Sequence, residues 1–194
     1  MSDTIRTFIA IKLPENIISL ISKIQEGIKS YGLKIRWVRP DNIHLTLKFL
    51  GNINEADIKK IGRAIFDALK EYPPISLAAK GTGVFPGVNQ PRVVWVGVTG
   101  QLESLIGMQK ALDEKLETIG FPKENRPFKG HLTLARVKGK IDPQRLSEAI
   151  KEFQGFESEP FTADQVILFK SELQPKVSVY TKLWSVALGY SQRQ

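Results

Sequence analysis

The four-residue sequence HLTL occurs twice in this chain, at residues 44–47 and 131–134. The two copies contain the only two histidines of the chain, His44 and His131, and a threonine follows in each copy, Thr46 or Thr133. Side chains alternate between the two faces of a β-strand, so each His–Thr pair shares one face and the leucines share the other. The leucines suit a core between sheet and helices, and the polar pairs would then be presented together on the open face.

Paired histidines and hydroxyls predict acid–base chemistry at phosphorus. Histidine suits proton transfer near neutral pH because its unperturbed pKa is about 6.5. One imidazole can take a proton from an attacking water while the other, protonated, gives a proton to a leaving oxygen. Each threonine hydroxyl can donate a hydrogen bond to a phosphoryl oxygen. The pattern predicts a metal-independent attack on a phosphodiester, with a bell-shaped dependence of rate on pH.

Other interpretations of these residues have weaker support. A histidine in a strand is often an ordinary polar residue, but two in identical sequences and none elsewhere favour a paired site. A metal site would need carboxylate ligands as well, and neither H-E-x-x-H nor H-x-H occurs. Serine catalysis lacks a G-x-S-x-G sequence, and the absence of cysteine excludes thiol catalysis and disulfides. The glycine-rich stretch GTGVFPG, residues 81–87, matches no nucleotide-binding loop and is expected to be a turn.

The apolar pattern predicts an α+β fold built from two related halves. Helices are expected over residues 16–29, 55–69, 102–119 and 143–153, and strands over residues 4–12, 37–38, 43–50, 75–80, 93–98, 131–137, 161–170 and 180–188. The order helix, HLTL strand, helix, strand, strand occurs twice, which indicates a duplication over approximately residues 14–98 and 102–188. We expect one bilobal domain over residues 1–194, with pseudo-two-fold-related halves, each a mostly antiparallel sheet backed by helices, and a groove between them.

Composition and charge limit the class of protein and partner. The formal net charge of +8 and the pI near 9.6 favour a polyanionic partner such as nucleic acid, although a generally basic protein is the alternative. The apolar N-terminal stretch is interrupted by Lys12, Pro14 and Glu15, so it is predicted to be neither a membrane span nor a signal sequence. We therefore expect a cytoplasmic protein with no membrane partner, and a monomer because no spare apolar face is evident.

The flanks of the two HLTL sequences resemble the two-histidine phosphoesterase superfamily, and within it the RNA 2′,3′-cyclic phosphodiesterases, also described as 2′-5′ RNA ligases. The resemblance covers nearly the whole chain and is carried, in the expected order, by RTFIAIKLP, NIHLTLKFLG, PRVVWVGV, NRPFKGHLTLAR and YTKLWSVAL. A single H-x-T-x sequence is common by chance, whereas two of them within these flanks are specific.

The resemblance implies a bilobal fold and hydrolysis of an RNA-terminal 2′,3′-cyclic phosphate to a 2′-phosphomonoester, without a cofactor. By position, His44 would be the general acid that protonates the departing 3′ oxygen, and His131 the general base that activates water. Thr46 and Thr133 would hold the non-bridging oxygens. Partners would be RNA ends, with tRNA fragments or 2′-5′-linked oligonucleotides among the candidates. RNA 2′-5′ end joining in the same site, or RNA binding without turnover, are the alternatives.

Three further residues are candidates for substrate binding. Arg136 follows the second HLTL sequence and is expected to bind phosphate, although strict alternation puts it on the face opposite His131 unless a bulge intervenes. Phe8 could stack on a nucleobase or pack in the core, and Tyr180 could reach the groove. Other aromatic residues are expected in the core: Trp37, Phe49, Trp95 and Trp184. A basic rim that could attract RNA is predicted from Lys34, Arg36, Arg39, Lys48, Arg92, Arg126, Lys129, Lys138 and Lys140.

Overall fold

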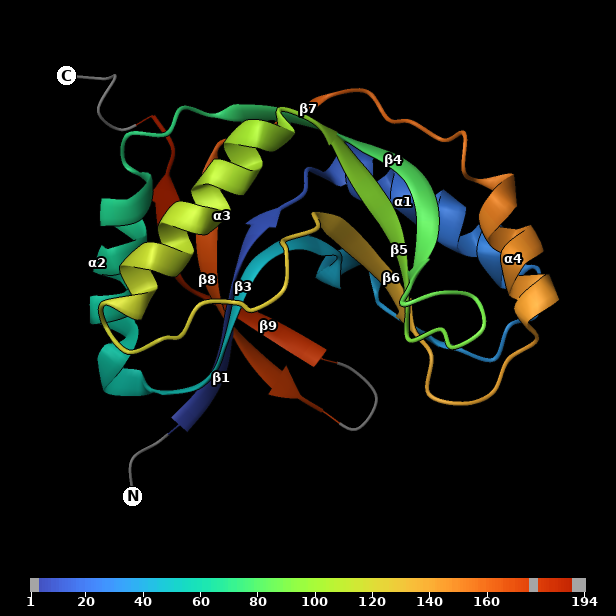
Figure 1. Cartoon of the computed structure of the whole chain (residues 1–194), viewed down its shortest axis with the longest axis horizontal. Helices are drawn as coiled ribbons and strands as arrows, with labels where there is room; N and C mark the ends of the chain where they lie inside the picture. Colours follow the sequence, from blue (N-terminus) through green and yellow to red (C-terminus); the bar gives the residue numbers. More distant parts are fainter. Residues whose placement is uncertain (1–3, 175–177, 190–194) are drawn as a thin grey trace.

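The computed structural model describes residues 4–174 and 178–189 (Figure 1). Its strands are β1 (Thr4–Lys12), β2 (Arg36–Trp37), β3 (His44–Asn54), β4 (Ile75–Phe85), β5 (Val93–Gly100), β6 (His131–Arg136), β7 (Phe161–Ala163), β8 (Gln165–Leu173) and β9 (Ser178–Ala187). Its α-helices are α1 (Glu15–Lys29), α2 (Ile58–Leu69), α3 (Leu102–Glu117) and α4 (Pro143–Glu152), and the short 3₁₀ helices are η1 (Pro40–Asn42) and η2 (Glu55–Asp57). None of the helices in these ranges is long and apolar enough to cross a bilayer.

The strands form one continuous antiparallel sheet in the order β7-β4-β5-β6-β3-β1-β8-β9, with β2 added beside β6. The predicted α+β class is confirmed. The sheet has two halves, β7-β4-β5-β6 and β3-β1-β8-β9, and each contains strands from both predicted repeats. These halves meet where β3 pairs with β6, so the two HLTL strands are neighbours at the middle of the sheet.

The prediction of a single strand over residues 161–170 is wrong. This segment contains two strands, and Asp164 separates them. Strand β7 pairs with β4 at one end of the sheet, whereas β8 pairs with β1 in the other half. Periodicity reports that a segment is extended, but it carries no information about a change of partner strand.

The helices cover one face of the sheet in two pairs. Helices α1 and α4 contact each other, and α4 lies against β4; α2 and α3 contact each other and lie against β9 and β3 (Figure 1). Gly62 lets α2 approach the sheet closely, because a Cβ there would lie 2.4 Å from the Trp184 ring. The leucines of both HLTL sequences are buried in the core beneath these helices, as predicted.

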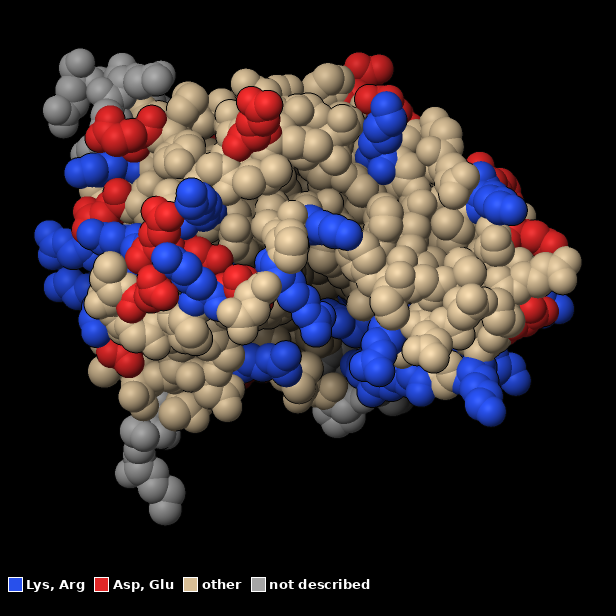
Figure 2. All heavy atoms as spheres, viewed as in Figure 1, with Lys and Arg blue, Asp and Glu red and all other residues tan. Residues whose placement is uncertain are grey.

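The opposite face of the sheet is open. It is hollowed near the middle, and lysine and arginine side chains gather around the hollow (Figure 2). Because side chains alternate, the residues between the buried leucines of β3 and β6 project toward this open face. The fold therefore places the four polar HLTL side chains on the side that a ligand can reach.

Candidate active site

The two HLTL strands are related by a local two-fold arrangement. Leu45 of β3 pairs directly with Leu132 of β6 in antiparallel orientation. His44 and His131 each precede the paired leucine, so both lie on the open face. With a rise of roughly 3.3 Å per residue and roughly 5 Å between strands, their Cα atoms are about 8 Å apart. That separation lets both imidazoles reach one small group between them.

Both histidines are held by the same backbone contact. Nδ1 of His44 lies 2.7 Å from the carbonyl oxygen of Asn42, and Nδ1 of His131 lies 2.7 Å from the carbonyl oxygen of Lys129. A carbonyl oxygen only accepts hydrogen bonds, so Nδ1 carries the proton in each ring. Nε2 is then the atom free to take or give a proton, and it is the same atom in both halves.

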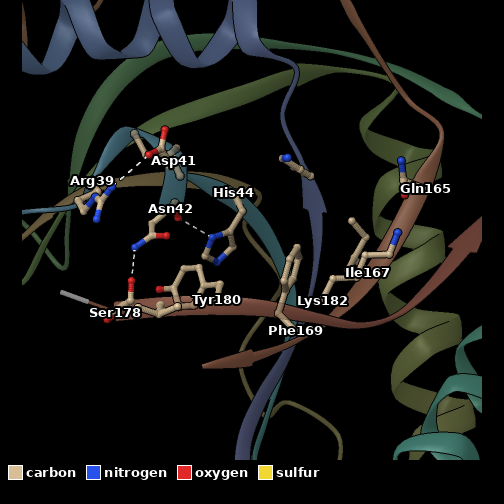
Figure 3. Close-up of a pocket in the computed structure, with 13 residues that line it drawn as sticks. Arg39, Asp41, Asn42, His44, Gln165, Ile167, Phe169, Ser178, Tyr180 and Lys182 are labelled. Atoms are coloured by element: carbon tan, nitrogen blue, oxygen red, sulfur yellow. Dashed lines mark hydrogen bonds and ion pairs between the residues drawn. The ribbon is translucent and has the colours of Figure 1, made fainter. Parts of the chain in front are cut away.

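The side chain of Asn42 fixes the first of these contacts in place. Its Nδ2 donates to the backbone oxygen of Ser178, at the start of β9, over 2.6 Å. The residue that orients His44 is therefore tied to a strand far away in sequence, as the dashed lines in Figure 3 show.

Aromatic rings pack against His44 on two sides. The Phe8 ring stacks on it with centroids 4.6 Å apart, and the Tyr180 ring meets it edge-on at 5.3 Å. Phe8 is only 3% exposed, and Phe169 stacks on it as well. Phe8 therefore supports the His44 ring and has no face open for a nucleobase, which favours the packing alternative over direct stacking on a base. His131 has thinner support, from the edge of Phe85 at 5.1 Å.

The surroundings of His44 disfavour its charged form. The pKa of His44 is lowered from 6.5 to about 4, mainly by burial, although the hydrogen bond to Asn42 acts in the opposite direction. Electrostatic repulsion from Arg136 and His131 is a smaller part of the same lowering. These electrostatic contributions also indicate that Arg136 and both imidazoles share one small region.

A β-bulge brings Arg136 to the open face. Consecutive residues of β5 pair with Thr133 and Ala135, so Leu134 is an extra residue in β6. Leu134 and Ala135 are both buried, and alternation resumes one position later. Arg136 consequently lies exposed on the same face as His131 and Thr133, which resolves the conflict with strict alternation.

Strand β3 contains the equivalent bulge. Consecutive residues of β1 pair with Thr46 and Lys48, which makes Leu47 the extra residue. Phe49 therefore occupies in β3 the place that Arg136 occupies in β6, on the open face. It is 53% exposed, so the expectation that it lies in the core is wrong. A position-by-position comparison of HLTLKF with HLTLAR aligns Phe49 with Arg136 and could have predicted its place on the open face.

Lys48 does not belong to the basic rim. It is 3% exposed, forms an ion pair with Asp113 of α3 and donates to the backbone oxygen of Pro122. The bulge turns it to the helix-covered face, where it ties α3 and the following loop to β3. The other residues of the predicted rim are exposed: Lys34, Arg36, Arg39, Arg92, Arg126, Lys129, Lys138 and Lys140.

A cavity of about 540 Å³ lies beside His44, between η1, β1, β8 and β9 (Figure 3). Tyr180 lines this cavity. Two cationic residues that were not among the candidate site residues, Lys12 and Lys182, line it as well. Lys12 pairs with His44 across the ladder between β1 and β3. Among the residues described here, no group of three or more His, Cys, Asp or Glu side chains could hold a metal ion.

Comparison with known proteins identifies the family. The profile described as LigT like Phosphoesterase matches the chain twice, over residues 11–95 and 96–180, once around each HLTL sequence. The chain belongs to the LigT-like phosphoesterase family. Proteins named RNA 2′,3′-cyclic phosphodiesterase from Methanothermobacter thermautotrophicus and Methanocaldococcus jannaschii share 36% and 37% identity with this phosphoesterase. The aligned regions cover 92% and 90% of the chain, respectively, and 96% of each relative.

Solved structures share the fold of this phosphoesterase. A protein from Thermus thermophilus superposes with a TM-score of 0.78 at 26% identity, covering 95% of this chain and 98% of that one. Apo LigT from E. coli gives a TM-score of 0.74 at 26% identity, with 96% and 99% covered. LigT has also been crystallised with 3′-AMP, and that structure gives a TM-score of 0.70 at 27% identity, again with 96% and 99% covered.

Proposed function

We propose that this phosphoesterase hydrolyses RNA-terminal 2′,3′-cyclic phosphates to 2′-phosphomonoesters, with no metal ion, by acid–base catalysis between His44 and His131. The observation that carries the proposal is the matched pair of Nδ1–carbonyl contacts, which leaves two free Nε2 atoms on one face of the sheet. The names of the relatives support the substrate class, and the 3′-AMP complex of LigT supports a nucleotide phosphate as ligand.

In the proposed reaction His131 Nε2 takes a proton from water as the water oxygen bonds to phosphorus. The bond between phosphorus and the 3′ oxygen breaks, and His44 Nε2 gives its proton to that oxygen. The product carries a 2′-phosphate and a free 3′-hydroxyl. Strand register supports a place for Thr46 beside His131 and for Thr133 beside His44, where their hydroxyls would donate to the non-bridging oxygens.

The low pKa of His44 fits the role of acid if binding of the anionic substrate favours protonation of this imidazole. In the free protein His44 is neutral at pH 7, since its pKa is about 4. A bound phosphate anion favours the charged imidazole and raises this pKa, so His44 can carry a proton near neutral pH in the complex and give it to the leaving oxygen. Arg136 would share the charge of the bound phosphate, and Tyr180 would hold the His44 ring at the edge of the cavity.

The direct test is hydrolysis of a short RNA with a 2′,3′-cyclic phosphate end in excess EDTA. The product is then analysed to determine whether its phosphate is on the 2′ or the 3′ oxygen. We expect turnover by the wild type. His44→Ala and His131→Ala should each lower kcat by about 10²–10⁴-fold, the usual contribution of a general acid or base, while binding of the RNA changes little. Activity that EDTA abolishes and zinc restores would refute the metal-free mechanism, and normal turnover by both variants would make the histidines structural.

The division of roles has its own test. Bis(4-nitrophenyl) phosphate has a leaving group that needs no proton. On this substrate the activity of His44→Ala should approach the wild-type value, whereas His131→Ala should stay impaired. The reverse order would exchange the two assignments. Adding an RNA with a 5′-hydroxyl as acceptor distinguishes the two reactions. Hydrolysis gives an RNA with a 2′-phosphate end, whereas joining gives a longer RNA with a 2′-5′ linkage.

A further inference from the structure

The cavity beside His44 extends over the half of the open face that lies away from His131. Strands β1, β8 and β9 follow β3 in the sheet, on the side opposite β6. Lys12 of β1 and Lys182 of β9 line the cavity on either side of β8. In Figure 3, Lys182 lies beyond Phe169 as seen from His44. The cavity therefore begins at the proposed acid and continues toward the β9 edge of the sheet.

The lining of this cavity is cationic. Among the described residues that line it, Lys12, Arg39 and Lys182 carry positive charges, and Asp41 carries a negative one. Asp41 pairs with Arg39 over 3.3 Å. Neither lysine forms an ion pair with any residue in the described part of the chain, and both are exposed. Two ammonium groups without counter-charges beside one cavity favour an anionic ligand.

The geometry of the proposed reaction indicates which part of the substrate meets this cavity. The attacking water and the departing 3′ oxygen lie roughly in line, on opposite sides of the phosphorus atom. Because His131 would activate the water, the 3′ oxygen and its ribose lie on the side of His44. RNA that continues from this ribose toward its 5′ end then passes over β1, β8 and β9, where the cavity lies.

The two lysines are placed to contact a group beyond the reacting phosphate. Strand β9 is third from β3 in the sheet, so Lys182 is about 14 Å across the strands from His44, at roughly 4.8 Å per strand. That is too far for its side chain to reach a phosphate held between the two histidines. Lys12 pairs with His44 itself, but on the side of this histidine that faces away from His131. Both positions therefore suit the next part of the RNA.

We propose that Lys12 and Lys182 bind the phosphodiester that joins the terminal nucleotide of the RNA to the nucleotide on its 5′ side. The inference rests on the proposed function, including the division of roles between the two histidines. The ammonium groups stand on flexible four-carbon stems, so they can meet one phosphate from two different strands. A 2′,3′-cyclic mononucleotide lacks this phosphodiester. The subsite would therefore make the enzyme prefer an RNA end to a cyclic mononucleotide.

The experiment compares kcat/KM for 2′,3′-cyclic AMP with kcat/KM for the dinucleotide ApA that has a 2′,3′-cyclic phosphate end. Lys12→Gln and Lys182→Gln should each lower the ratio of the dinucleotide value to the mononucleotide value by about tenfold, since a charged hydrogen bond is lost only with the dinucleotide. A partial loss of folded protein cancels in this ratio. The matched control is Lys60→Gln, which removes the same charge from an exposed position on α2 and should leave the ratio unchanged.

A second dinucleotide, with an uncharged methylphosphonate in place of the phosphodiester, tests the contact itself. With the wild type, kcat/KM for this analogue should be about tenfold or more below the value for the charged dinucleotide, because the ammonium groups lose their anionic partner. Lys12→Gln and Lys182→Gln should cause little further loss with the analogue. A structural role of either lysine would lower kcat/KM equally for the charged and the uncharged linkage.

Two results would overturn the proposal. An equal loss on the mononucleotide and the dinucleotide would place the effect of the lysines on the reacting phosphate or on the fold, and an unchanged ratio would make them an ordinary solvated surface. If the wild type opens neither substrate, the proposed function fails by itself. Calorimetric binding of ApA with a 2′-phosphate end then tests the subsite alone: weaker binding by Lys182→Gln than by Lys60→Gln supports it, and equal binding refutes it.

Discussion

The imidazole of His44 should titrate near pH 4 in the free protein and at a higher pH once an anion is bound. The lowering from 6.5 to about 4 comes mainly from burial. It corresponds to a cost of about 3 kcal/mol for protonating His44, at about 1.4 kcal/mol per pH unit. At pH 7 only about one molecule in a thousand would carry that proton. The proposed acid is therefore protonated to a useful extent only when a phosphate compensates its charge.

The assay is proton NMR of the imidazole rings over pH 3.5–8, which is simple here because the chain has only two histidines. A His131→Gln variant assigns the two resonances. Sulfate serves as the probe, since it remains a dianion over this range. Sulfate should raise the pKa of His44, and by linkage its affinity should rise as pH falls from about 6.5 to about 4, by at most about 300-fold. Arg136→Gln should also raise this pKa, because the positive charge of Arg136 lowers it. Arg63→Gln on α2 is the matched control.

Either of two observations would refute this reasoning. A His44 resonance that titrates at 6.5 or above without ligand would mean that the ring is not desolvated. A pKa that stays near 4 at saturating sulfate would mean that no bound anion reaches the ring, and His44 could then not supply a proton near neutral pH.

Three further predictions concern stability. As pH falls from about 6.5 to about 4, the wild type should lose up to about 3 kcal/mol of unfolding free energy relative to His44→Gln, because the unfolded state binds a proton at His44 more readily than the folded state does. If denaturant titrations give the same difference in unfolding free energy between the two proteins at every pH in this range, the idea is wrong. Gln25→Met removes the donor to the backbone oxygens of Val38 and of Leu134, the bulge residue of β6, and should cost about 1–3 kcal/mol of unfolding free energy. An unchanged urea midpoint would contradict this. Lys48→Met leaves the buried carboxylate of Asp113 without its cation and should cost about 3–5 kcal/mol of unfolding free energy. The double variant Lys48→Met/Asp113→Leu should recover most of this loss. Equal losses in the single and the double variant would argue against a buried ion pair.

The sequence predicted local structure well where one element determines it. The bounds of β1 agree with the predicted strand over residues 4–12, and the leucines of both HLTL sequences are buried as alternation requires. The α+β class followed from the order of elements. Such features depend on periodicity within one segment, which the sequence displays directly.

Features that depend on a partner strand could not be predicted in the same way. The bulges at Leu47 and Leu134 exist only in the register with β1 and β5, and each one shifts alternation by one position. For this reason Phe49 was expected in the core and Lys48 at the rim, although the structure exposes the first and buries the second. The pairing of Arg36 with Arg136 is hidden for the same reason, since the two residues are distant in sequence.

The most direct test of the account is a crystal structure of the complex with a nucleoside 2′-phosphate, the proposed product. We predict that a phosphate oxygen lies within about 2.6–3.2 Å of Nε2 of His131 and that the ribose 3′-hydroxyl oxygen lies within the same distance of Nε2 of His44, with the hydroxyls of Thr46 and Thr133 donating to the phosphate. A complex in which one imidazole contacts neither the phosphate nor the 3′-hydroxyl, or in which the phosphate binds elsewhere while both Nε2 atoms face water, would contradict the claim that the two histidines act on one phosphorus atom.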